Sequence, residues 1–141
     1  MPESTEHLDL IKRLANYVNS KFSECGSLSV ICDLPTIIGG ERPPRIKGFT
    51  PDLFATDVPT TRTILGEAKT DKDLETDHSR RQLSAFIDYL SHQAGGLLIV
   101  AVPWRVVGAA QRMIRGIFIQ AGAPTNVDVI ILDEISEYRT L

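Results

Sequence analysis

Apolar residues recur at intervals of three and four over residues 5–22, which is the spacing of one face of an α-helix. Polar residues fill the positions between them, so the sequence predicts an amphipathic helix here, with Ser4 or Thr5 as its N-terminal cap. The same spacing returns over residues 74–93 and again from Pro103 to about residue 121, where proline suits the first turn of a helix. The chain is therefore expected to form three helices.

Five shorter segments have the β-branched and apolar composition of strands. They are residues 27–34, 52–56, 61–69, 97–102 and 127–132. Every residue of the fourth segment is apolar, as expected for a strand covered on both faces. The predicted order is α-β-β-β-α-β-α-β. It describes a single α/β domain over residues 1–141, with a mixed central sheet flanked by helices and with an additional C-terminal helix and strand.

Composition places the chain among ordinary globular proteins. Its 141 residues are 43% hydrophobic and 23% charged, which excludes a disordered chain, and its longest apolar run, residues 97–103, is too short to cross a bilayer. Cys25 and Cys32 have no partners at zinc-ligand spacing, and the first residues lack the pattern of a secretory signal, so we expect free thiols and a cytoplasmic protein. The formal net charge of −3 argues against a protein that coats nucleic acid indiscriminately, but it allows a local basic groove.

The candidate chemistry is concentrated in two segments, Pro51-Asp52 and Glu67-Ala68-Lys69. Asp52 opens one predicted strand and Glu67 lies near the end of the next, so antiparallel pairing brings both carboxylates to one edge of the sheet. Glu67 and Lys69 are two positions apart and project to the same face. Two neighbouring carboxylates favour a hard divalent cation such as Mg²⁺, or Mn²⁺ in its place, and the carbonyl of Ala68 is a further candidate ligand. Lys69 would then activate the attacking water or stabilise the transition state, which is the machinery of phosphodiester hydrolysis.

These residues resemble the signature of the PD-(D/E)xK nuclease superfamily, and the predicted order of elements over residues 6–102 resembles its αβββαβ core. The resemblance implies a restriction-endonuclease-like fold and a metal-dependent nuclease that acts on DNA. Residues 65–70, followed by Arg81-Gln82-Leu83, are similar to RecB-type and resolvase-type members, in which a glutamine on the next helix faces the metal site. Gln82 is the matching residue. The RecB-type pattern has an aromatic residue, usually tyrosine, four positions later, where this chain has Phe86 with Tyr89 nearby.

Many members of the superfamily also carry a glutamate on the first helix. Glu6 is the candidate for this metal ligand, with Glu3 as its rival. The short motif by itself has an alternative interpretation, a surface strand pair with a salt bridge between Glu67 and Lys69. The order of the surrounding elements and the position of Gln82 favour the nuclease interpretation.

Basic residues flank the proposed site on both sides in the sequence. We expect Arg45, Lys47 and Arg81 to contact the phosphates of a nucleic acid. The alternative is a solvated surface, because acidic residues are interspersed with basic ones over residues 69–81 and leave that segment neutral in sum.

The sequence therefore predicts a Mg²⁺-dependent nuclease whose partner is DNA. The expected metal ligands are Asp52, Glu67, Ala68 and Glu6, and the expected catalytic residues are Lys69 and Gln82. The alternative is a non-catalytic module of the same fold that binds nucleic acid or protein. A dimeric junction resolvase is a further option, since the broad apolar stripe of the last helix offers a surface for a homodimer, unless that stripe packs on the protein's own sheet.

Overall fold

The computed structural model describes residues 4–22, 28–34, 41–57 and 61–139. Cys25, one of the two expected free thiols, lies outside these residues. Cys32 is a free, half-buried thiol.

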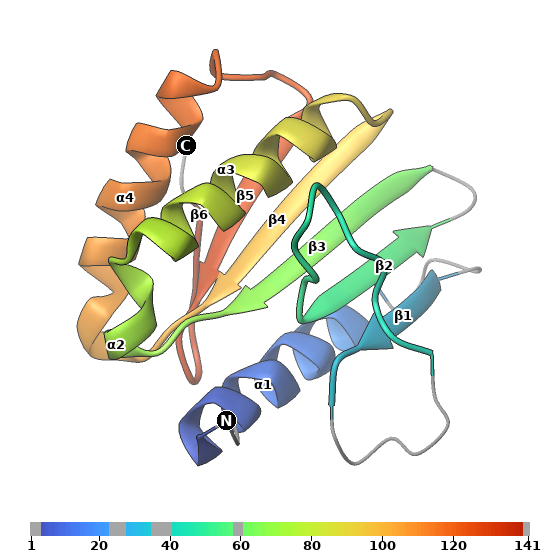
Figure 1. The fold of residues 1–141 in the computed structure, drawn as a ribbon. Coiled ribbons are helices and arrows are strands. Elements are labelled where there is room, and N and C mark those ends of the chain that lie inside the picture. The colour runs from blue at the N-terminus through green and yellow to red at the C-terminus, as the bar shows by residue number, and fades with distance from the viewer. Residues whose placement is uncertain (1–3, 23–27, 35–40, 58–60, 140–141) are drawn as a thin grey trace.

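A six-stranded mixed sheet forms the centre of the molecule, with the strands in sequence order (Figure 1). The first three strands pair antiparallel, the third to fifth pair parallel, and the last is again antiparallel. The strands are β1 (Leu28–Cys32), β2 (Leu53–Asp57), β3 (Arg62–Ala68), β4 (Gly95–Ala101), β5 (Val127–Leu132) and β6 (Glu137–Arg139). The predicted mixed sheet and the αβββαβ order of its first part are confirmed.

The first predicted helix matches the structure closely, whereas the second begins later than predicted. In α1 (Thr5–Lys21), the side chain of Ser4 caps the helix by accepting a hydrogen bond from the His7 N–H at 3.1 Å. The helix predicted over residues 74–93 corresponds to α3 (Asp77–Ser91), which begins three residues later than predicted, and a separate short helix, α2 (Asp71–Leu74), precedes it. The break between α2 and α3 falls at Glu75 and Thr76, because Thr76 has an extended backbone and its hydroxyl caps α3 by accepting from the Ser79 N–H at 3.1 Å.

The C-terminal part of the chain differs from the prediction in two places. A turn of 3₁₀ helix, η1 (Trp104–Val106), precedes α4 (Val107–Gln120), because Pro103 holds an extended backbone before the helix can start. Strand β6 was not predicted, since its three residues are largely exposed and too few to show a pattern. It is held beside β5 by a turn in which the buried Asp133 carboxylate accepts from the N–H groups of Ile135 (2.9 Å) and Ser136 (2.6 Å).

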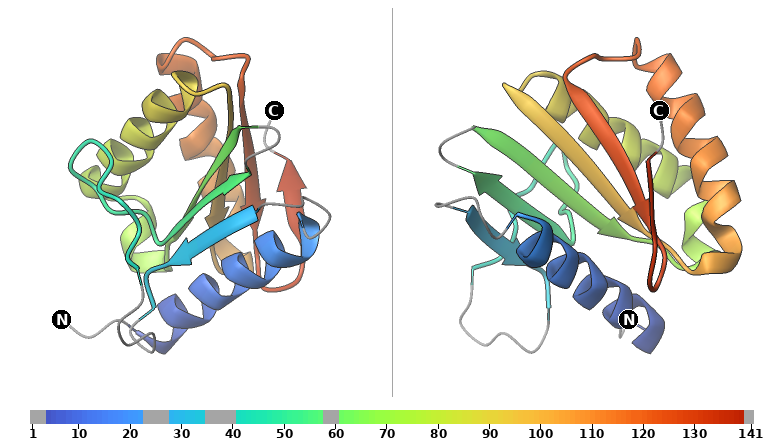
Figure 2. Two further views of the ribbon diagram at one scale, coloured as in Figure 1. Left: turned by 90° about the vertical axis from the view of Figure 1, so that its right-hand side faces the viewer. Right: turned by 180° about the vertical axis from the view of Figure 1, so that it is seen from behind.

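The sheet lies between two helical layers. Figure 2 shows α1 on one face and the pair α3 and α4 on the other. Strand β4 has a core on both sides, with Leu97, Ile99 and Ala101 facing the α1 layer and Leu98 and Val100 facing the α3–α4 layer. Val102, the residue after the strand, also faces the α3–α4 layer. This two-sided burial explains the uninterrupted apolar run in the sequence. Truncating a buried side chain such as Ile99 to alanine would cost about 2–5 kcal/mol.

Close packing at Gly66 fixes the position of α1 over the middle of the sheet. A Cβ atom at this position would lie 3.0 Å from the Cβ of Leu53 and 3.4 Å from both methyl groups of Leu14 on α1. Glycine therefore lets the helix approach β3 directly beside Glu67. The first turn of α1 is thereby brought to the sheet edge at which β3 ends.

A small hairpin covers part of the sheet ahead of β2. Residues Ile46 and Phe49 form an isolated bridge, and the turn residues between them, Lys47 and Gly48, have positive φ angles of 50° and 88°. Positive φ at both positions is typical of a type I′ turn, which glycine adopts without strain. Ile46 is buried in the core, so the hairpin is anchored where the chain enters Pro51-Asp52.

The apolar stripe of the last helix is not a free surface. Its members Val107, Ala110, Met113, Ile114, Ile117 and Phe118 are buried against the protein's own sheet and α3. The stripe covers one face of the protein's own sheet, which was the alternative to a homodimer surface, so the helix gives no support for a homodimer. None of the helices in the described ranges is long and apolar enough to cross a membrane.

Candidate functional site

Strand register brings Asp52 and Glu67 together. Leu53 at the start of β2 pairs with Gly66 of β3, so the preceding residue, Asp52, lies opposite Glu67. The Asp52 N–H donates to Oε2 of Glu67 at 3.3 Å, and the Ala68 N–H donates to Oδ2 of Asp52 at 2.9 Å. Asp52 is 6% exposed and Glu67 is 4% exposed. The two carboxylates thus share a largely buried position at the sheet edge.

Lys69 and Gln82 complete a hydrogen-bonded group around Glu67. The Nζ atom of Lys69 lies 3.7 Å from Oε1 of Glu67 and donates a short hydrogen bond to Oε1 of Gln82. The Nε2 atom of Gln82 donates to the same Glu67 oxygen at 3.1 Å. The amide of Gln82 therefore links the ammonium to the carboxylate and holds both in place from α3.

The backbone around Ala68 is oriented toward the same position. Its N–H points to Asp52, whereas the next N–H, that of Lys69, donates to the carbonyl of Ala101 in β4 at 2.9 Å. In an extended strand the N–H and C=O of one residue point to the same side. The carbonyl of Ala68 therefore faces the Asp52 side, where a metal ligand was expected.

Electrostatics make this arrangement unfavourable unless a cation balances it. Burial, followed by the charge of neighbouring Asp52, raises the pKa of Glu67 well above its usual value, and Lys69 opposes this only in part. Two carboxylates, a backbone carbonyl and open space fit Mg²⁺, which takes one or two carboxylates and completes its shell with water and substrate oxygens. Within the described residues, no group of three or more His, Cys, Asp or Glu side chains is arranged to hold a metal ion, so the donor set does not fit a closed zinc site.

An open pocket of about 520 Å³ gives access to these residues. Besides the carboxylate group, its walls include His7 from α1, Asp33 after β1 and His78 from α3. The ring of His78 packs edge-on against Phe49 of the hairpin, with 5.5 Å between ring centroids. The pocket is thus bounded by three different parts of the fold around one pair of acids.

The structure does not bring Glu6 to this pocket. Its carboxylate is ion-paired with Arg105 at 3.2 Å and lines a separate pocket with Asp9, Arg13 and Glu134. The next residue, His7, faces the site instead, with Nε2 3.5 Å from Oδ2 of Asp52. Successive helix residues differ in direction by about 100°, so one position decides which side chain enters the pocket. Nothing in the sequence pointed to His7 beyond its place next to the expected glutamate.

None of the three expected phosphate-binding residues lines the pocket. Arg45 donates to the carbonyl of Gly48 at 2.9 Å within the hairpin turn, and Lys47 forms a short ion pair with Asp88 on α3. Arg81 is exposed on α3. Any contact that these residues make to a substrate is therefore to a part of it outside the carboxylate pocket.

Comparison with solved structures supports the fold assignment. The structure of SfsA from Pyrococcus furiosus in complex with Ca²⁺ superimposes with a TM-score of 0.51 and 14% sequence identity. The match covers 92% of this chain and 61% of the SfsA chain, so this protein spans less than two thirds of the length of SfsA. At this identity the likeness shows a shared fold alone. No protein-family model and no curated protein sequence matches the chain.

Proposed function

We propose that this protein is a Mg²⁺-dependent nuclease that hydrolyses phosphodiester bonds in DNA. The observation that carries the proposal is the buried pair of Asp52 and Glu67 beside the ammonium of Lys69, at the base of an open pocket. The shared fold with SfsA, whose structure contains Ca²⁺, is further support for a divalent cation here.

Each residue of the site has a role that follows from its contacts. Asp52, Glu67 and the carbonyl of Ala68 are the ligands that would hold the cation, since they are oxygen donors that face one position. When bound, the cation would supply charge that stabilises the phosphoryl oxygens and favours ionisation of a water nucleophile. Lys69 contributes a fixed positive charge that stabilises the additional negative charge of the transition state. Gln82 keeps this ammonium beside Glu67 and out of bulk water.

A cleavage assay tests the proposal. Purified protein is incubated with single-stranded, duplex and branched DNA in the presence of Mg²⁺ or Mn²⁺, and in EDTA. We expect cleavage only with the cation, and we expect Lys69→Ala to abolish it while DNA binding persists, because the lysine acts in the chemical step.

The matched control is Lys12→Ala, which removes the same charge from an exposed position on α1 and should retain activity. Failure of the wild-type protein to cleave any of the three substrates would contradict the proposal. DNA binding without cleavage would then favour a non-catalytic binding module of the same fold.

A further inference from the structure

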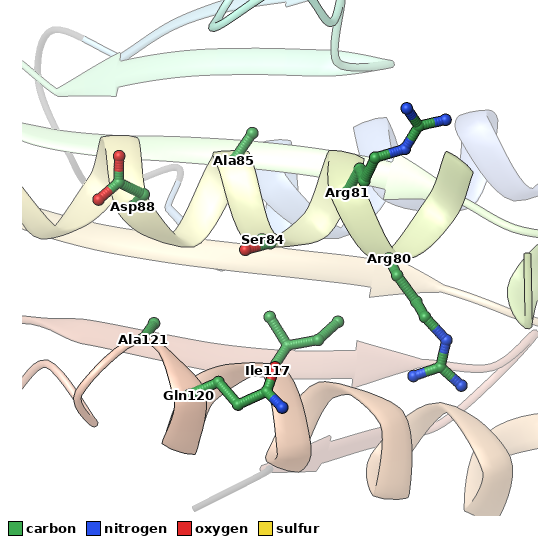
Figure 3. Close-up of a pocket in the computed structure, with 8 residues that line it drawn as sticks. All are labelled: Arg80, Arg81, Ser84, Ala85, Asp88, Ile117, Gln120 and Ala121. Atoms are coloured by element: carbon green, nitrogen blue, oxygen red, sulfur yellow. The ribbon is translucent and has the colours of Figure 1, made fainter. Parts of the chain in front are cut away.

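A second concave surface lies between α3 and α4 (Figure 3). This groove has a volume of about 560 Å³. Its hydrogen-bond donors are Arg80, Arg81, Ser84 and Gln120, and Ile117 provides an apolar wall. A concave surface with an apolar wall and a few convergent donors is typical of a ligand site.

The groove carries positive charge that the protein does not neutralise. In the part of the chain that the structure describes, neither Arg80 nor Arg81 forms an ion pair with an acidic side chain. Asp88 also lines the groove, but its carboxylate is ion-paired with Lys47. Figure 3 shows the Arg80 side chain extending from α3 toward α4, whereas Arg81 extends to the other side of α3. The groove therefore favours an anion.

The groove and the carboxylate pocket are both lined by residues of α3. His78 lines that pocket, whereas Arg81 and Ala85 line the groove, and these three residues follow one another at spacings of three and four. They lie on one face of α3. Gln82, which contacts Glu67, and Arg80 in the groove are two positions apart and lie on opposite sides of α3. A strand that runs from the carboxylates to the groove therefore crosses the helix, whose diameter of about 10–12 Å corresponds to about three nucleotides along a duplex axis.

We propose that the groove between α3 and α4 binds a sugar-phosphate unit of the substrate strand, about three nucleotides from the scissile bond. The guanidinium of Arg80 contacts the phosphate, and Ile117 contacts the sugar. This assignment rests on the proposed nuclease function and extends it, because it adds a subsite that positions the strand. Arg80 is thus a binding residue, distinct from the catalytic group at Lys69.

Steady-state cleavage of the best DNA substrate in Mg²⁺ tests this assignment with Arg80→Ala. Because a hydrogen bond to a charged group is lost, we expect KM to rise roughly tenfold while kcat stays close to that of the wild type. The slope of log(kcat/KM) against log salt concentration should become shallower by about 0.7 to 0.9, the amount for one phosphate contact. The control is Arg115→Ala, which removes the same charge from an exposed position on α4 outside the groove and should leave both constants unchanged.

A second measurement locates the phosphate. Each substrate in a series carries one uncharged methylphosphonate, at a different position near the cut. At one position the substitution should raise KM for the wild type but leave the KM of Arg80→Ala unchanged, because that variant has already lost the contact to this phosphate. If Arg80→Ala behaves like Arg115→Ala in an active enzyme, the groove assignment is wrong and the nuclease assignment stands. If the wild-type protein cleaves no DNA, both assignments fail.

Discussion

Replacing Glu67 with glutamine is expected to stabilise the protein in the absence of divalent cations. Asp52, Glu67 and Lys69 are 6%, 4% and 5% exposed, so two negative charges and one positive charge are buried together. Glu67→Gln removes one negative charge and leaves Asp52 and Lys69 as a neutral pair. The amide has the size of the carboxylate and keeps an oxygen that can accept from Gln82.

The magnitude follows from opposing electrostatic contributions. At the 3.7 Å separation of Lys69 and Glu67, their attraction is about 4 kcal/mol at an effective dielectric constant of about 20. Repulsion from the adjacent Asp52 offsets much of this attraction, which leaves the cost of burying the Glu67 charge largely uncompensated. We therefore expect Glu67→Gln to raise the free energy of unfolding by about 1–3 kcal/mol. For a chain of this length, that corresponds to an increase in Tm of roughly 3–10 °C.

The pH dependence of this difference has a definite sign. Folding raises the pKa of Glu67 above its usual value of 4.5, so the folded protein holds this proton more tightly than the unfolded chain does. The resulting stabilisation is complete below pH 4.5 and is lost as the pH rises through the higher pKa of the folded state. The difference between Glu67→Gln and the wild type is therefore largest above that pKa and closes as the pH falls toward 4.5.

Thermal unfolding, followed by circular dichroism with EDTA and with Mg²⁺, is the assay. A cation at 100 times its Kd would stabilise the wild type by about 2.7 kcal/mol, and Glu67→Gln should lose most of this response. Glu75→Gln, the same chemical change at an exposed residue, serves as the control. A Glu67→Gln variant that unfolds at or below the wild-type Tm in EDTA at pH 8 would refute the argument that the site holds uncompensated charge.

Three further outcomes are expected. Gln82→Ala should lower kcat by at least about tenfold with little change in KM, because Lys69 loses the oxygen that positions it; an unchanged kcat would show that Glu67 alone suffices. His7→Ala should reduce cleavage more than Glu6→Ala, since His7 contacts Asp52; the reverse order would favour Glu6 as the ligand. Asp133→Ala should destabilise the fold by about 1–3 kcal/mol in denaturant titration, because the N–H groups of Ile135 and Ser136 lose their hydrogen bonds to a charged acceptor; an effect below about 0.5 kcal/mol would contradict this.

Asp133 also gives the opposite pH response from Glu67. Burial acts to raise the pKa of the Asp133 carboxyl, but the N–H groups of Ile135 and Ser136 hold this pKa below its usual range. A carboxylate with a lowered pKa stabilises the fold above its unfolded pKa, and this contribution is lost as the pH falls through the folded pKa.

The order of helices and strands could be predicted because each long element carries a clear period. The two-sided burial of β4, for example, is visible as six consecutive apolar residues, 97–102. The approach of Asp52 to Glu67 also follows from sequence, because antiparallel strands joined by a short connection place the start of one opposite the end of the other.

What could not be predicted depends on single positions and on tertiary contacts. The separation of α2 from α3 depends on the extended backbone at Thr76, within a segment whose composition suits a continuous helix. Strand β6 is specified by the turn at Asp133 and by Arg13, whose Nε atom donates to the Asp133 carbonyl at 3.0 Å. Likewise, the choice between Glu6 and His7 depends on the rotation of α1, which the close contact at Gly66 fixes.

The most direct test of the central claim is a crystal of this protein soaked in Mn²⁺ and measured at the manganese absorption edge. We expect an anomalous peak within coordination distance, about 2.2 Å, of oxygens from both Asp52 and Glu67, and no such peak in Asp52→Asn crystals treated in the same way. A wild-type crystal without a peak between these carboxylates at saturating Mn²⁺, or with Mn²⁺ bound only elsewhere, would contradict the proposal that the buried pair is a catalytic metal site.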